Sequence, residues 1–410
     1  MAQRVIVIGA GAAGTTAAIF AATAGAETTL LERTRDGGRK ILISGGGRCN
    51  VLPSRLDEGR FITDSSANTL RKIVRSWPLA EQIAFFEREV GVALEEETES
   101  AKLFPASHKA RDVRDGLLAL ASARGAAVRM DTVVAGIEPH GHGWRVAREG
   151  GAPLDCDAVI VATGGLSVPA TGSDGRGLRM LTALGHVTHP TYAALTPITT
   201  ELSAFTELSG VSLSVSITAR SATRAATASG GFLFTHRGYS GPSALDVSHV
   251  VVRSRHENQE PRASLSVCWS PLDEAAWTER LRPQGARTVL GAVRAELPDR
   301  LAAVLVSQAG IGDGRTLAEM TRDERRRLIE TLLRGTLPWS GDEGYKKAEV
   351  MGGGIDLAEI DPRTMESRRH RGLFLCGEVL DAFGPIGGYN FLWAWCTGRA
   401  AGVGAARGAS

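Results

Sequence analysis

The chain has 410 residues, which at about 150 residues per domain suggests two or three domains and a core large enough to hold a cofactor. Its residues are 43% hydrophobic and 22% charged, a composition that fits a globular protein and excludes a disordered or fibrous one. The formal net charge of +2 gives no electrostatic reason to bind nucleic acid, so we expect a small-molecule substrate and no nucleic-acid partner.

Glycine and cysteine usage narrow the class further. The 49 glycines cluster along the chain, which is typical of backbone that turns sharply or approaches a ligand closely. The five cysteines are an odd number at wide spacings without a CxxC pair, which argues against a structural zinc, an iron–sulfur cluster and a local redox dithiol. We therefore expect no metal, mostly packed thiols and a reducing, cytoplasmic compartment.

The N-terminal segment 5–26 carries no charge, so a signal peptide or a membrane span has to be considered there. Its internal pattern indicates otherwise, because a β-branched run at 5–8 is interrupted by glycines and followed by small residues that suit a helix. No other stretch is long and apolar enough to span a bilayer, so we expect no membrane partner.

The same segment predicts the βαβ unit of a dinucleotide site. A strand at 4–8 leads into GAGAAG at 9–14, a helix follows to about residue 24, and a second strand at 27–31 ends at Glu32. Gly9 permits the tight turn, Gly11 lets the backbone approach a pyrophosphate, and Gly14 lets helix and strand pack closely. Glu32 is placed to accept hydrogen bonds from an adenosine ribose, and an acid there disfavours NADP in this site.

Three further segments favour FAD over NAD. Residues 35–50 combine five glycines with basic and amide side chains in one loop, which suits a diphosphate and the polar edge of an isoalloxazine ring. Residues 157–165 read as a buried parallel strand that ends in ATGG. Residues 372–402 read as a strand, a turn with two acids, and GGYN opening a helix, with Asn390 as its N-cap and the helix N-terminus facing the flavin N1/O2 locus.

These segments supply most of the predicted site residues. The cofactor-binding set is Gly9, Gly11, Ala12, Ala13, Gly14, Glu32, Arg33, Arg39, Lys40, Ser44, Gly45, Gly46, Gly47, Arg48, Cys49, Asn50, Val133, Ala162, Thr163, Gly164, Gly377, Glu378, Asp381, Gly387, Gly388, Tyr389 and Asn390. The catalytic candidates are Lys40, expected near the flavin N5, with His236 and Tyr239. The alternative for His236 and Tyr239 is that they fix one domain against the other, and for Cys49 a structural thiol is favoured over a reactive one.

Several motifs in order along the chain resemble the YhiN/BaiN-type flavoproteins, also described as aminoacetone-oxidase-family FAD-binding enzymes or NAD(P)/FAD-dependent oxidoreductases. They are GRKILISGGGRCN, FPASHKA, ATGGLSVPATGSDGRG, LFTHRGYSGPSAL, MGGGID and CGEVLD with GGYN. The chain differs where relatives typically show GEVLDVDGxTGGYN, because GEVLDAFGPIGGYN is less polar. The resemblance therefore implies FAD binding but leaves any relative's substrate in doubt.

The resemblance also implies the architecture: an α/β, Rossmann-like FAD-binding domain split by an inserted β-rich, barrel- or sandwich-like domain with a small helical lobe. Alternating residues at 211–217 and 264–269 independently predict antiparallel strands, and 286–297 and 321–333 show helical spacing. We expect the FAD-binding domain at 1–189 and 345–410. The insert is expected at 190–344, with its β-rich part at 190–272 and its helical lobe at 273–344.

Three interpretations of the function stay open. No second GxGxxG follows, so the separate NAD(P)H domain of a disulfide reductase is not expected. The first interpretation is an FAD-dependent reductase that takes hydride from transiently bound NAD(P)H and passes it to a small organic acceptor. The second is an oxygen-using amine oxidase or dehydrogenase, and the third is a flavin-binding protein without turnover. The sequence identifies neither the substrate nor the oligomeric state.

Overall fold

The computed structural model describes residues 2–201 and 205–408. The chain divides into two compact units. Unit 1 comprises Met1–Thr191 and Val350–Ser410, and unit 2 comprises Tyr192–Glu349. A parallel sheet together with antiparallel sheets confirms the expected mixed α/β class.

Unit 1 is organised around a five-stranded parallel sheet in the order β20-β10-β1-β2-β6. Its strands are β1 (Arg4–Ile8), β2 (Glu27–Leu31), β6 (Ala127–Arg129), β10 (Ala158–Val161) and β20 (Leu373–Leu375). The burial of β1, β10 and β20 is nearly complete, which explains their continuous apolar runs. The predicted βαβ unit is therefore confirmed, and a strand from the far end of the chain joins the same sheet.

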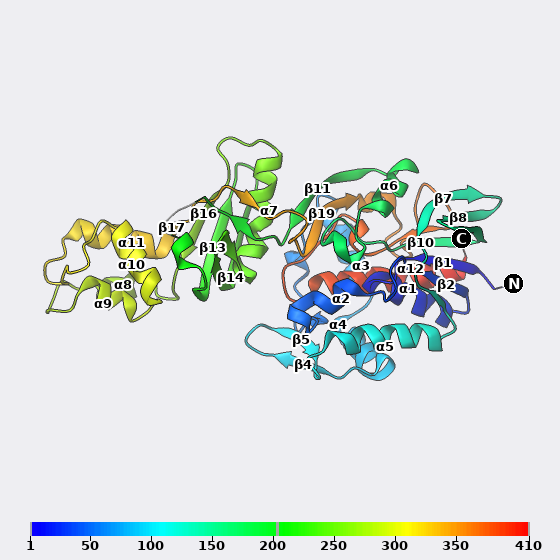
Figure 1. Ribbon diagram of the computed structural model, residues 1–410, viewed down its shortest axis with the longest axis horizontal. Helices are drawn as coiled ribbons and strands as arrows, with labels where there is room; N and C mark the ends of the chain where they lie inside the picture. Colours follow the sequence, from blue (N-terminus) through cyan, green and yellow to red (C-terminus); the bar gives the residue numbers. More distant parts are fainter. Residues whose placement is uncertain (1, 202–204, 409–410) are drawn as a thin grey trace. The chain divides into compact units, whose positions relative to one another are not determined.

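Helices cover this sheet (Figure 1), and unit 1 also contains two three-stranded antiparallel sheets and the two-stranded sheet of β11 (Thr188–Ala194) and β19 (Val350–Ile355). The helices are α1 (Ala12–Thr23), α2 (Arg39–Ile43), α3 (Ala67–Arg75), α4 (Leu79–Phe85), α5 (Ala110–Ala123), α6 (Arg176–Ala183) and α12 (Tyr389–Arg407). One three-stranded sheet consists of β3 (Leu52–Pro53), β5 (Lys102–Pro105) and β4 (Leu94–Glu97), and the other of β7 (Val134–His140), β8 (Gly143–Arg148) and β9 (Gly151–Cys156). The chain leaves unit 1 in β11 and returns in β19.

Helices α1 and α12 pack side by side in the same direction (Figure 1). Glycines permit the close approach: a Cβ added to Gly398 would lie 2.4 Å from the Ala13 carbonyl oxygen, and one added to Gly402 would lie 2.3 Å from that of Ala17. Gly398 lies nine residues after α12 begins, whereas Ala13 lies in the first turn of α1. The N-terminus of α12 therefore extends beyond that of α1 by roughly 12 Å along the helix axis.

Unit 2 contains one seven-stranded antiparallel sheet in the order β17-β16-β13-β14-β15-β12-β18. Its strands are β12 (Ile198–Thr199), β13 (Ser212–Arg220), β14 (Ala225–Thr235), β15 (Gly238–Ser240), β16 (Ser264–Cys268), β17 (Gly335–Thr336) and β18 (Gly341–Asp342). Helix α7 (Pro242–His256) packs on β13 and β14.

A helical lobe follows β16 (Figure 1). Its helices are α8 (Glu274–Arg280), α9 (Val289–Arg294), α10 (Asp299–Gln308) and α11 (Arg322–Arg334). Helix α11 begins in a capping box, because the Thr321 hydroxyl accepts from the Glu324 amide while the Glu324 carboxylate accepts from the Thr321 amide. One hydrophobic core joins this lobe to the sheet of unit 2.

Candidate functional site

The carboxyl ends of four parallel strands bring the predicted loops of unit 1 together. Strand β1 runs into Gly9, β2 into Glu32, β10 into Ala162 and β20 into Gly377. In an open parallel sheet, ligands bind at this edge. Segments more than 300 residues apart in the sequence therefore meet at one site because they end neighbouring strands.

The glycines of the first turn differ in what surrounds them. Gly9 has a φ of +103°, and a Cβ added there would lie 2.6 Å from the Ala162 carbonyl oxygen. A Cβ at Gly14 would lie 1.8 Å from the Gly9 carbonyl oxygen, so the close packing of helix and strand needs glycine. A Cβ at Gly11 would meet no atom of the described residues within 4 Å. The space beside Gly11 is where the sequence predicts the pyrophosphate.

The start of α1 suits an anion. Its N-cap is Gly11, no side chain caps the helix, and the first turn contains no acidic residue. The free N–H groups and the positive end of the helix dipole therefore have no competing partner from a capping side chain. Ala12 and Ala13 lie in this turn, and Ala13 also touches Gly377, since a Cβ added to Gly377 would lie 2.8 Å from the Ala13 Cβ.

Glu32 is 7% exposed and already braces the turn. One carboxylate oxygen accepts from the Ala10 amide at 2.7 Å, and the other accepts from the amide and hydroxyl of Thr34, both at 2.8 Å. Each carboxylate oxygen has two acceptor positions, so a further bond from a ribose is compatible with this arrangement. The ribose contact stays a prediction.

The glycine-rich segment at residues 35–50, which the sequence suggests is one loop, contains helical structure. It contains α2 and a short 3₁₀ helix, Ser44–Gly47, in which Gly45, Gly46 and Gly47 have φ values of 55°, 67° and 87°. Two of its predicted cations already have partners: Arg39 contacts Asp36 at 2.7 Å, and Arg48 contacts Glu97 at 3.0 Å. The Arg48 guanidinium also lies 4.2 Å from the centre of the Phe104 ring.

Cys49 and Asn50 end this loop. Cys49 is buried, its amide donates to the Ser44 carbonyl, and burial raises the pKa of its thiol to about 12, so the thiol stays protonated at neutral pH. This is the behaviour of a structural thiol. The buried Oδ1 of Asn50 has no hydrogen-bond partner among the described residues. A buried acceptor without a donor is costly, and a bound ligand would supply the missing donor.

The C-terminal segment presents a second uncapped helix. Gly388 is the N-cap of α12 at a φ of +90°, no side chain caps the helix, and its first turn has no acid. A Cβ added to Gly388 would lie 2.4 Å from the carbonyl carbon of Leu52. Neighbouring Gly387 has a φ of +119°. The positive end of α12 is thus open to an electron-rich group.

The prediction that Asn390 caps α12 is wrong. Asn390 is the second residue of the helix, and its side chain clamps Gly384: Oδ1 accepts from the Gly384 amide and Nδ2 donates to its carbonyl, both at 2.9 Å. The helix begins at Tyr389, with Gly388 in the αL conformation as its N-cap, which is two residues too early for Asn390 to serve as N-cap. Tyr389 is 4% exposed; its hydroxyl accepts from the Asp57 amide at 3.2 Å and donates to the Arg55 carbonyl at 3.4 Å.

Asp381 is 2% exposed and fixes residues 63–65. Its Oδ2 accepts from the hydroxyls of Thr63 and Ser65, at 2.9 and 2.8 Å, and from the amides of Asp64 and Ser65, at 2.9 and 2.8 Å. His189 Nε2 lies 3.7 Å from the same oxygen. The structure therefore gives Asp381 a positioning task in addition to the predicted contact with the cofactor.

Lys40 and Glu378 form a partly buried ion pair that sequence reasoning did not connect. Lys40 Nζ lies 2.5 Å from Glu378 Oε2 and 2.6 Å from Ser167 Oγ. Ser167 is fully buried and donates to Glu378 Oε1 at 2.5 Å. Ser167 was absent from the predicted site, although its place just after ATGG, at the end of a parallel strand, was the available signal.

The remaining predicted residues of unit 1 line the same edge or support it. Arg33 pairs with Asp174 at 2.5 Å. The Val133 carbonyl accepts from the Glu149 amide, and the Ala162 amide donates to the Ile8 carbonyl. The buried Thr163 Oγ1 has no partner among the described residues. Gly164 has a φ of +71°, and a Cβ added there would lie 2.7 Å from Ser173 Oγ.

In unit 2, His236 and Tyr239 have different surroundings. His236 is exposed in the turn between β14 and β15. Tyr239 is 1% exposed within the hydrophobic core, its hydroxyl donates to the Pro338 carbonyl at 2.9 Å, and burial raises the pKa of its phenol. A phenol held this way supports the core of unit 2 and is not presented to a substrate.

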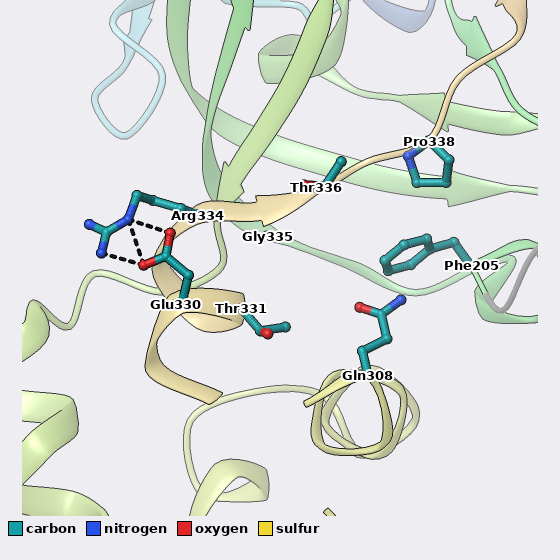
Figure 2. Close-up of a pocket in the computed structure, with 8 residues that line it drawn as sticks. All are labelled: Phe205, Gln308, Glu330, Thr331, Arg334, Gly335, Thr336 and Pro338. Atoms are coloured by element: carbon teal, nitrogen blue, oxygen red, sulfur yellow. Dashed lines mark hydrogen bonds and ion pairs between the residues drawn. The ribbon is translucent and has the colours of Figure 1, made fainter. Parts of the chain in front are cut away.

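Unit 2 also contains a hollow of about 410 Å³ (Figure 2). Its lining residues are Phe205, Gln308, Glu330, Thr331, Arg334, Gly335, Thr336 and Pro338. The charges at its wall are satisfied within one helix, because Arg334 pairs with Glu330 at 2.5 Å. None of the predicted site residues lines this hollow.

Within residues 2–201 and 205–408, no helix is both long and apolar enough to cross a membrane. The same residues contain no cluster of His, Cys, Asp and Glu side chains suited to a metal ion.

Comparisons with known proteins identify a family and relatives that match nearly the whole chain. The family described as HI0933-like protein Rossmann domain matches residues 3–404. The ribosomal RNA dihydrouridine synthase of Escherichia coli (strain K12) is 32% identical over 95% of this chain and 94% of its own. The 3-dehydro-bile acid delta(4,6)-reductase of Clostridium scindens is 28% identical over 98% of this chain and 99% of its own.

A solved structure supports the fold. The 3-ketosteroid delta1-dehydrogenase from Sterolibacterium denitrificans aligns with a TM-score of 0.53 and 12% identity over 98% of each chain. At this identity the likeness concerns the fold alone.

Proposed function

Because this chain belongs to the HI0933-like Rossmann family of FAD-dependent oxidoreductases, we propose that it reduces a carbon–carbon double bond conjugated to a carbonyl group. The observation that carries FAD binding is the pair of uncapped helices in unit 1. Helices α1 and α12 run in the same direction, and their N-termini are offset by roughly 12 Å. Bound FAD would place its diphosphate at the start of α1 and its ring system at the start of α12.

The residues present fit FAD. The open space at Gly11 and the uncapped start of α1 suit the diphosphate, and Glu32 lies on the neighbouring strand end for the ribose. The start of α12 offers positive potential to the ring edge on which negative charge gathers. The buried Asn50 Oδ1 has no hydrogen-bond partner among the described residues, so it is free to accept a hydrogen bond from the cofactor.

The bound FAD supplies hydride chemistry, and the protein's residues bind, orient and tune it. Lys40 places a cation beside the cofactor loops, balanced by Glu378. The apolar replacements at Ala382 and Phe383 exclude water from the neighbourhood of α12, since these residues are 3% and 1% exposed.

The substrate class follows from the names of two relatives. One is named for making dihydrouridine and the other for reducing the delta(4,6) bonds of a 3-dehydro bile acid. In uracil and in a 3-oxo-Δ4 ring, the double bond to be reduced is conjugated to a carbonyl. Hydride delivery to such a bond leaves charge on the carbonyl oxygen, which a nearby cation or amide stabilises.

A second candidate narrows the substrate to uridine within ribosomal RNA. The observation that favours it is that two relatives at 32% identity, from Escherichia coli and Haemophilus influenzae, carry that name. It bears directly on the expectation that nucleic acid is not a partner, which the near-zero net charge suggested and which stays unconfirmed.

We propose NAD(P)H as the transient electron donor. All five cysteines are free thiols, and the sequence contains no CxxC dithiol motif. Electron delivery through a cysteine pair therefore has no support. An oxygen-using amine oxidase and a flavin-binding protein without turnover are the alternatives.

Anaerobic mixing separates these functions. The proposal predicts that NADH or NADPH bleaches the visible flavin band, that a 3-oxo-Δ4 compound or a uridine-containing ribosomal RNA fragment restores it, and that the acceptor gains two hydrogen atoms. Bleaching by an amine, with peroxide formed on aeration, would support the oxidase instead. No bleaching by any of these reagents would contradict turnover.

A further inference from the structure

Lys40, Ser167 and Glu378 close a ring of hydrogen bonds. The Lys40 ammonium donates to Glu378 Oε2 at 2.5 Å and to Ser167 Oγ at 2.6 Å, and the Ser167 hydroxyl donates to Glu378 Oε1 at 2.5 Å. The three residues come from α2, from the loop after β10 and from the turn after β20. The ring therefore ties together three separate segments of the predicted cofactor site.

The ring leaves Lys40 with one uncommitted donor. An ammonium has three N–H groups, and two of them point at Ser167 and Glu378. The third has no partner among the described residues. Because two bonds fix the tetrahedral nitrogen, the direction of the third N–H is fixed as well.

Each acceptor of the ring is itself held in place. Glu378 Oε1 also accepts from the Met351 amide at 2.8 Å, in the first residues of β19. The preceding Gly377 is fixed by α12, because its amide donates to Thr397 Oγ1 at 2.9 Å and its carbonyl accepts from Trp393 Nε1 at 3.1 Å. Glu378 is thereby anchored to α12, and Gly377 in turn contacts Ala13 of α1.

Ser167 is fixed by burial and by its backbone. It is 0% exposed, and Val168 directly after it has a φ of +47°. A β-branched residue in the left-handed region is strained, and such strain is retained where the local geometry is needed. The side chains of Lys40 and Glu378 are 27% and 17% exposed, so the open side of the ring is the lysine side.

We propose that Ser167 and Glu378 are positioning residues that aim a single Lys40 N–H at the flavin and offset its positive charge. This inference rests on FAD binding by the family and is independent of the substrate proposed above. When reduction adds negative charge to the ring system, a fixed cation stabilises the reduced form and an adjacent carboxylate opposes that stabilisation. The ring therefore sets the reduction potential of the bound flavin.

The test measures the reduction potential and the FAD affinity of the holoprotein without any substrate. Lys40→Met removes the cation and is expected to lower the affinity for reduced FAD about tenfold relative to oxidised FAD, a fall of about 30 mV for a two-electron couple. Glu378→Gln leaves Lys40 unbalanced and is expected to raise the potential by a similar amount. Arg35→Met, which removes an exposed cation from the same loop, is the matched control and should leave the potential unchanged.

The double variant Lys40→Met/Glu378→Gln tests whether Glu378 acts through Lys40. We expect a potential close to that of Lys40→Met alone, because Glu378 then has no ammonium to position or offset, so the two single effects do not add. Ser167→Ala keeps both charges and serves if a charge variant fails to fold; it should shift the potential in the direction of Lys40→Met by a smaller amount.

Three results would overturn the proposal. One is a Lys40→Met potential equal to that of Arg35→Met. Another is a Glu378→Gln shift that is the same with and without Lys40, and the third is a Ser167→Ala protein indistinguishable from wild type. A wild-type protein that binds FAD with the expected variant pattern but reduces no conjugated double bond would contradict the proposed function and leave this inference intact.

Discussion

Substitution of Gly11 by alanine separates ligand binding from folding at the first turn. Gly11 has a φ of −81°, and an added Cβ meets no atom of the described residues within 4 Å. Alanine therefore fits the free protein, and we expect the free energy of unfolding to change by less than about 0.5 kcal/mol. The methyl group would occupy the space predicted for the diphosphate. Loss of one charge-assisted hydrogen bond costs about 1.5–3 kcal/mol, so FAD should bind roughly ten- to hundredfold more weakly.

Gly14→Ala is the matched comparison, because it adds the same methyl group within the same motif but is expected to destabilise the fold. Its Cβ would lie 1.8 Å from the Gly9 carbonyl oxygen, which forces α1 away from β1. Overpacking of this kind costs about 1–3 kcal/mol. Denaturant unfolding of the apoprotein and fluorescence titration with FAD measure the two effects. Wild-type FAD affinity in Gly11→Ala, or a loss of stability equal to that of Gly14→Ala, would refute the assignment of Gly11 to the cofactor.

Three further predictions concern buried polar groups. Asp381→Ala removes the acceptor for the Thr63 and Ser65 donors and should destabilise the protein by about 2–4 kcal/mol, seen as a lower urea midpoint; an unchanged midpoint would contradict the positioning task. Burial raises the pKa of the Cys49 thiol from 9.0 to about 12. The protonated thiol therefore contributes fully to stability below pH 9, and this contribution is lost between pH 9 and 12, where only the unfolded chain ionises. A free energy of unfolding that stays constant across this range would contradict the raised pKa. Burial lowers the pKa of His186 from 6.5, so stability should fall as the pH drops below 6.5, and an NMR titration of the ring at or above its ordinary pKa would be the contrary result.

Sequence analysis predicted best those parts of the fold whose conformation depends on residues close together in the sequence. The turn at Gly9, Gly11 and Gly14 follows a strand and opens a helix, so its geometry depends on neighbours within a few residues. The alternating pattern of β13 and the capped helix α11 are local in the same sense. These elements appear in the structure close to their expected bounds.

What the sequence did not reveal depends on partners far along the chain. The ion pair between Lys40 and Glu378 joins residues 338 positions apart, and Ser167 completes it from a third segment. Asn390 has a side chain that commonly caps helices, but α12 begins before it, at Tyr389, with Gly388 as its N-cap. Tyr239 is a polar residue in a motif, and only the packing of unit 2 shows that it belongs to the core.

The central claim is that the two uncapped helix starts in unit 1, α1 and α12, hold one FAD molecule. The most direct measurement releases the cofactor from the purified protein by heat and identifies it by chromatography against FAD, FMN and NAD standards. The account predicts FAD in about equal amount to the protein from wild type and a marked loss of it from Gly11→Ala. Recovery of NAD or FMN instead, or failure of the wild-type protein to take up added FAD, would contradict it.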